Sequence, residues 1–139
     1  MTNSEDNLPA PTVWPTLQAR DALALIDFYV TAFGFDKTAV YADGDQVAHA
    51  QLDWPEGGGI MLGSHKPDGE WSREPGTFGA YVVTADVDAV YERIKAAGVD
   101  VSPPVDQDYG NREIKVADPE GNLWSFDSYR GEPRAQGGG

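Results

Sequence analysis

Two side chains in this sequence could carry out acid–base chemistry together. His49 lies in the segment Ala48-His-Ala-Gln51, where small and polar residues alternate as in a strand with one packed face. Glu113 takes the equivalent position in a second, similar unit of the chain. Imidazole titrates near neutral pH and a carboxylate would fix its tautomer, so a His49–Glu113 pair could move a proton. The alternative, a strand histidine that is only hydrogen-bonded, stays open and is the one the sequence favours.

Composition excludes several other chemistries. The chain has no cysteine, so it has no thiolate nucleophile, disulfide or Cys-based zinc site. Its 23 acidic residues against 10 basic ones give a formal net charge of −13. Such a field attracts cations and repels phosphates, so we expect no nucleic-acid partner. No apolar run approaches the ~20 residues of a membrane helix, and a polar start predicts a cytoplasmic protein without a membrane partner.

The elements that position these side chains are duplicated, with an offset of about 64 residues. Each unit has an aspartate that caps a helix-like run, a glycine that ends it, and a Pro-Glu-Gly turn before an apolar strand. These features are Asp21, Gly34 and Pro55-Glu56-Gly57 in the first unit, and Asp86, Gly98 and Pro119-Glu120-Gly121 in the second.

Strand patterns complete both units. The predicted strands are 13–19, two strands within 37–53 around the Asp43-Gly44 turn, and 60–63, then 78–84, 99–105, 112–116 and 123–128. Each unit is then βαβββ and too small to bury both faces of its sheet, so we expect the units to pair, within one chain or by exchange between chains. The predicted organisation is a disordered N-terminus (1–11), a first unit (12–63), a linker (64–76), a second unit (77–129) and a flexible C-terminus (130–139).

Several motifs resemble one protein family. They are Asp21–Tyr29 with Phe33-Gly34-Phe35, Tyr109–Glu113, and Asp118–Asn122, and together they span Thr12 to Tyr129 in the right order and spacing. The chain resembles the vicinal oxygen chelate superfamily of glyoxalases, bleomycin-resistance proteins and dioxygenases, in particular metal-free bleomycin-resistance-like members. The resemblance implies an α+β fold in which two βαβββ repeats form a U-shaped mixed sheet around a cleft, with helices outside and a second chain often completing it.

The same resemblance implies four metal-ligand positions. Carried over by their spacing from the helix caps and turn prolines, they fall on Trp14, Met61, Gly79 and Ser125. Indole, thioether, hydrogen and hydroxyl side chains do not suit a cation that needs imidazole or carboxylate ligands. We therefore expect no metal and no cofactor.

Strand alternation sorts the remaining side chains. Leu17, Trp124 and Phe126 should face the helices, and polar and aromatic residues should line the cleft. The predicted ligand-binding residues are Trp14, Gln18, His49, Gln51, Met61, Tyr81, Tyr109, Glu113, Ser125 and Asp127.

This lining predicts a metal-free homodimeric protein that sequesters a planar or cationic, antibiotic-like compound without turning it over. Two alternatives stay open. One is a glyoxalase-like lyase or isomerase, or a dioxygenase-type enzyme, acting on a small substrate in the same cleft. The other is a protein whose cleft no longer binds a ligand.

Overall fold

The computed structural model describes residues 9–135, so parts of the two predicted tails lie outside the described residues. The elements are β1 (Thr16–Ala19), α1 (Ala22–Phe28), η2 (Tyr29–Phe33), β2 (Asp36–Asp43), β3 (Gln46–Asp53), β4 (Gly59–Ser64), β5 (Gly79–Val83), α2 (Val87–Ala96), β6 (Val105–Asp106), β7 (Arg112–Ala117) and β8 (Leu123–Asp127). No helix within residues 9–135 is long and apolar enough to cross a membrane.

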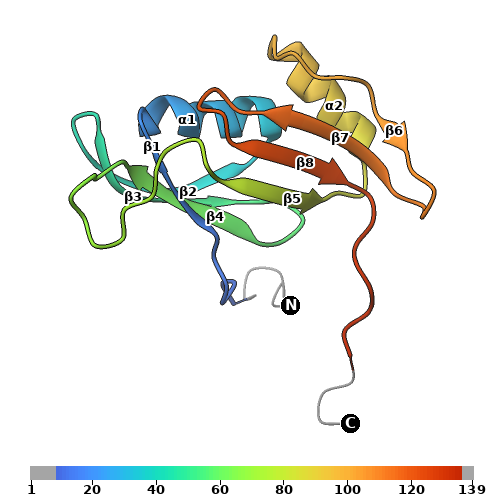
Figure 1. Ribbon diagram of the computed structural model, residues 1–139, viewed down its shortest axis with the longest axis horizontal. Helices are drawn as coiled ribbons and strands as arrows, with labels where there is room; N and C mark the ends of the chain where they lie inside the picture. Colours follow the sequence, from blue (N-terminus) through green and yellow to red (C-terminus); the bar gives the residue numbers. More distant parts are fainter. Residues whose placement is uncertain (1–8, 136–139) are drawn as a thin grey trace, which may run out of the picture.

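The strands form two four-stranded sheets with the same internal order, β1-β4-β3-β2 and β5-β8-β7-β6 (Figure 1). In each sheet the first and last strands of the unit pair in parallel, with Thr16 beside Met61 and Gly79 beside Leu123. The other pairs are antiparallel. This confirms the predicted α+β class and the two βαβββ repeats of mixed sheet.

Both helices begin at the predicted aspartates. An Asp21 carboxylate oxygen accepts a hydrogen bond from the Ala24 amide at 3.2 Å, and Asp86 accepts one from the Ala89 amide at 3.0 Å. Gly34 ends the first helical run in the left-handed region, at φ 91°. The sequence did not indicate that the last turn of this run, η2, is a π-helix, in which Tyr29 and Phe33 stack with ring centroids 5.6 Å apart.

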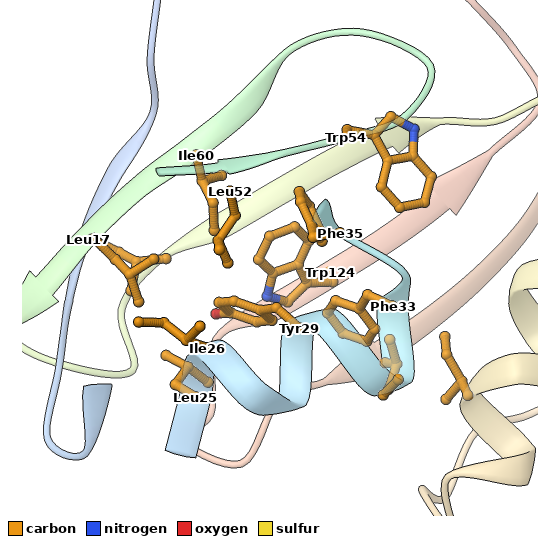
Figure 2. Packing of buried hydrophobic residues seen from close by; sticks show 14 of the residues in the cluster. Leu17, Leu25, Ile26, Tyr29, Phe33, Phe35, Leu52, Trp54, Ile60 and Trp124 are labelled. Atoms are coloured by element: carbon orange, nitrogen blue, oxygen red, sulfur yellow. The ribbon is translucent and has the colours of Figure 1, made fainter. Parts of the chain in front are cut away.

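The two units share one hydrophobic core. Leu17, Trp124 and Phe126 are all buried, as strand alternation predicted. Figure 2 shows Trp124 packed against Tyr29 of the first unit, and their ring centroids lie 5.0 Å apart. Trp54 likewise lies 5.7 Å from the Phe126 ring of the second unit. In this structure the units therefore pack together within one chain.

One predicted strand is wrong in extent. The segment 99–105 forms no strand before Val105, and β6 consists of Val105 and Asp106 alone. Pro103 and Pro104 lack the amide hydrogens that a sheet ladder needs, so pairing begins only after them. The first strand also begins later than predicted, at Thr16, directly after Pro15.

Candidate functional site

The predicted cleft residues fall into two sets, one on each sheet. Trp14, Gln18, His49, Gln51 and Met61 belong to the first sheet or the segment leading into it. Tyr81, Glu113, Ser125 and Asp127 belong to the second sheet, and Tyr109 lies in the loop before β7.

The second set contains a pair of carboxyl groups. Glu113 and Asp127 are register partners across β7 and β8. Asp127 is fully buried, and its two carboxylate oxygens accept hydrogen bonds from Asn111 Nδ2 at 2.8 Å and Ser125 Oγ at 2.7 Å. The Glu113 side chain is 15% exposed and accepts a hydrogen bond from Gln107 Nε2 at 3.1 Å.

Burial raises the pKa of Glu113, and the neighbouring Asp127 carboxyl group raises it further. Lys115, whose Nζ lies 3.8 Å from Glu113 Oε1, opposes this shift in the pKa, as does the bond from Gln107. Two carboxyl groups this close disfavour double ionisation. A shared proton or a bound cation would reduce the repulsion between the two carboxylates.

Two exposed tyrosines lie near the carboxyl pair. Tyr81 is 50% exposed and Tyr109 is 59% exposed. The Tyr81 hydroxyl donates to the backbone carbonyl of Tyr129 at 2.8 Å, and the Tyr109 and Tyr129 rings meet edge to face at 5.5 Å. Burial, followed by the charge of Asp127, raises the pKa of Tyr81. These rings place aromatic surface near the carboxyl groups of Glu113 and Asp127.

Asn111 organises this cluster, although it was not among the site residues predicted from the sequence. Its side chain is buried, and Nδ2 donates to Gln107 Oε1 at 2.7 Å as well as to Asp127. Its Oδ1 accepts from the Tyr129 amide at 2.8 Å. The only signal was its place in the motif Tyr109–Glu113, which indicated the family and not a role.

In the first set, Gln18 points its amide oxygen at the linker. That oxygen accepts hydrogen bonds from the backbone amides of Lys66 at 3.3 Å and Arg73 at 3.2 Å, and it lies 3.0 Å from His65 Nδ1. Gln18 therefore anchors an early and a late residue of the linker to β1.

Three other members of the first set also have local partners. The His49 ring stacks on Tyr41 with centroids 6.0 Å apart. Gln51 Nε2 donates to the Asp53 carboxylate at 3.2 Å, and Trp14 Nε1 donates to the Pro11 carbonyl at 3.0 Å. Within residues 9–135, no hydrogen bond or ion pair joins His49 to Glu113, so the described chain does not by itself assemble this pair.

The four inherited metal positions do not fit a metal. Trp14, Met61 and Gly79 offer no imidazole, carboxylate or thiolate, and Ser125 already donates its hydroxyl to Asp127. Among the described residues, no three His, Cys, Asp or Glu side chains are grouped so that they could hold an ion.

A cavity of about 400 Å³ lies between the two units. Its walls are mainly apolar and include Trp54, Ile60, Tyr81, Val83 and Trp124, with Arg130 also among the lining residues. Small organic ligands commonly occupy cavities of this size and character. Tyr81 belongs both to this cavity and to the rim of the carboxyl pair.

Comparison with known proteins gives one family. Residues 12–126 match the sequence model of the Glyoxalase/Bleomycin resistance protein/Dioxygenase superfamily. Uncharacterised proteins of Mycobacterium bovis and Mycobacterium tuberculosis (strain ATCC 25618 / H37Rv) are each 36% identical over 125 residues. Each match covers 84% of this chain. It covers 82% of the Mycobacterium bovis protein and 73% of the Mycobacterium tuberculosis protein.

Solved structures agree. TioX from Micromonospora sp. ML1 has a TM-score of 0.67 and 30% identity, covering 83% of this chain and 97% of its own. TnmS3, an antibiotic binding protein from Streptomyces sp. CB03234, has a TM-score of 0.67, 24% identity, and coverage of 86% and 98%. FosX, a fosfomycin resistance protein of Listeria monocytogenes solved with Mn(II), has a TM-score of 0.57, 19% identity, and coverage of 88% and 94%. The last two show the fold alone. The chain belongs to the glyoxalase/bleomycin resistance protein/dioxygenase superfamily.

Proposed function

We propose that this protein binds a planar, cationic small organic compound of the antibiotic type and sequesters it without turnover. The observation that carries the proposal is the Glu113–Asp127 carboxyl pair, whose charges act on the neighbouring, half-exposed Tyr81. A bound cation would stabilise the ionised form of the pair, and the nearby tyrosine rings would attract it through their π faces.

The surrounding features support the same ligand class. The cavity between the units is large enough for a planar body, and an aromatic stack adds ~0.5–1.5 kcal/mol beyond area burial. The net charge of −13 attracts cations before contact. TnmS3, which shares this fold, is named as an antibiotic binding protein, and this supports a ligand of the antibiotic type.

We also propose a homodimer located in the cytoplasm. The end strands β2 and β6 are unpaired edges in the described chain, and Leu123 on β8 is 67% exposed. A second copy would cover such edges and apolar surface. Sedimentation velocity at micromolar concentration tests this, with a monomeric mass as the contrary outcome.

Isothermal titration calorimetry with proflavine, a planar aromatic cation, tests the proposed function. Acridine, which is uncharged at pH 7.5, serves as the neutral probe. We expect proflavine to bind more tightly than acridine, and Glu113→Gln to weaken proflavine about tenfold. Glu92→Gln on the exposed side of α2 is the matched control and should change neither affinity. The proposal would be contradicted if wild type bound proflavine and acridine with equal affinity. It would also be contradicted if wild type and Glu113→Gln bound proflavine with equal affinity.

One observation favours an enzyme instead. A glutamate whose pKa is raised by burial and by a second carboxylate can act as a general acid, as a glyoxalase-like lyase or isomerase requires. If a substrate of this chain is found, loss of turnover with retained binding in Glu113→Gln would favour that alternative over sequestration.

A further inference from the structure

We propose that the first sheet carries a second binding site, for a planar aromatic anion, in the cavity between its open face and the linker. This cavity has a volume of about 200 Å³, and its lining includes Gln18, His49, Met61, Lys66, Trp71 and Arg73. Gln18, His49 and Met61 were expected to line a ligand cleft, but Lys66, Trp71 and Arg73 of the linker were not, and an anionic ligand goes beyond the proposed function.

Two basic side chains at this cavity have no acidic partner in the described part of the chain. Within residues 9–135, neither the Lys66 ammonium nor the Arg73 guanidinium forms an ion pair, although acids outnumber bases by 23 to 10 in the chain. Arg112 shows the contrasting case, with carboxylates of Asp88 at 2.8 Å and Asp106 at 2.9 Å. Two unpaired cations at one cavity leave charge-assisted hydrogen bonds available to an anionic ligand.

The backbones of both basic residues are held at one place. The amides of Lys66 and Arg73 bond to the same oxygen, Oε1 of Gln18. The two residues are therefore held beside β1 even though their side chains extend into solvent. Less chain entropy is lost when a ligand engages groups that are already held close together.

Part of the cavity lining is apolar or aromatic. Trp71 lies in the linker and is 71% exposed, which leaves a large aromatic surface in water. Met61 and His49 line the same cavity from β4 and β3. An indole and a thioether suit the face of a flat ring, and the cations suit an acid group attached to it. The cavity volume accommodates a ligand with a single aromatic ring or two fused rings.

Calorimetry with 2-naphthoate and its neutral analogue 2-naphthamide tests this site. We expect naphthoate to bind more tightly than naphthamide. The double variant Lys66→Gln/Arg73→Gln should weaken naphthoate about tenfold and leave naphthamide unchanged. Trp71→Ala should weaken both ligands, since it removes the stacking surface. Lys95→Gln/Arg134→Gln, which removes the same charge elsewhere, is the matched control and should bind like wild type.

Three results would overturn the proposal: no naphthoate binding at millimolar concentration, equal affinity for naphthoate and naphthamide, or unchanged naphthoate affinity in Lys66→Gln/Arg73→Gln. The substituted side chains are solvent-exposed, and an unchanged thermal unfolding midpoint verifies that the variants fold. The proflavine experiment depends on Glu113 and uses the opposite charge, so either proposal can fail while the other stands.

Discussion

The hydroxyl of Tyr29 donates a 2.5 Å hydrogen bond to Oδ2 of Asp118, joining the first unit to the second inside the core. The same carboxylate oxygen accepts from Asn122 Nδ2 at 2.9 Å and from Trp124 Nε1 at 3.2 Å. Burial, followed by the charge of Asp118, raises the pKa of Tyr29 far above its ordinary value, so the phenol remains a neutral donor. A buried carboxylate with several donors is therefore part of the contact between the units.

Removing this donor should destabilise the fold. We expect Tyr29→Phe to lower the free energy of unfolding by about 1.5–3 kcal/mol, because hydrogen bonds to charged groups contribute roughly that much. Urea denaturation followed by circular dichroism measures the change. Tyr91→Phe on α2, a half-buried position, is the control and should change it by less than about 0.5 kcal/mol. A Tyr29→Phe effect as small as that of the control would mean that the bond adds nothing to stability.

Local signals in the sequence predicted much of this fold. Asp21 and Asp86 cap their helices through contacts with residues three positions away, and Gly34 adopts the left-handed conformation that ends a helix. The alternation in β8 correctly assigned Trp124 and Phe126 to the core. Each of these features depends on neighbours within a few residues, and such neighbours are visible in a single sequence.

Features that depend on distant partners were not predictable in this way. Asp118 appeared only as the start of a turn, because its partner Tyr29 is 89 residues away. Gln18 was assigned to the cleft by alternation alone, whereas the structure directs its amide oxygen to the linker. Strand alternation gives the face on which a side chain lies but not what covers that face.

The Pro-Glu-Gly turns form a reciprocal contact between the units. Glu120 of the second unit accepts hydrogen bonds from the backbone amides of Arg20 at 2.7 Å and Asp21 at 2.9 Å, just before α1. Glu56 of the first unit accepts one from the Ala85 amide at 2.7 Å, just before α2. Each unit thus satisfies backbone donors ahead of the helix of the other.

This contact predicts unequal effects of two equivalent substitutions. Glu120→Ala should lower the free energy of unfolding by about 1–2 kcal/mol, because two backbone donors lose their partner, and Glu56→Ala by about half as much. Glu120→Gln keeps an acceptor oxygen and should lose less than Glu120→Ala. Urea denaturation ranks the three variants, and equal stability of Glu120→Ala and wild type would show that water replaces the contact at no cost.

The Glu113 pKa makes stability depend on pH. This pKa is raised in the folded protein. The folded state therefore binds more protons than the unfolded state at pH values between 4.5, the ordinary pKa, and the raised pKa. The free energy of unfolding therefore falls as pH rises through that window. Glu113→Gln removes the group that causes this decrease. The free energy of unfolding of the variant, relative to wild type, should therefore increase as pH rises through the window and stay constant above it. Parallel stability curves for the two proteins would contradict the raised pKa, as would a carboxyl carbon of Glu113 that titrates by NMR at its ordinary value.

The anchoring of the linker by Gln18 predicts a change in backbone protection without a change of fold. The amides of Lys66 and Arg73 both donate to its Oε1, so Gln18→Leu should leave them open to solvent. We expect hydrogen exchange at these two amides to rise by about tenfold or more, since each loses its acceptor. Gln18→Glu keeps an oxygen at the same place and should preserve their protection. Amides inside β4, such as Leu62, provide the internal reference, and equal exchange of Lys66 and Arg73 in wild type and Gln18→Leu would show that another contact holds the linker.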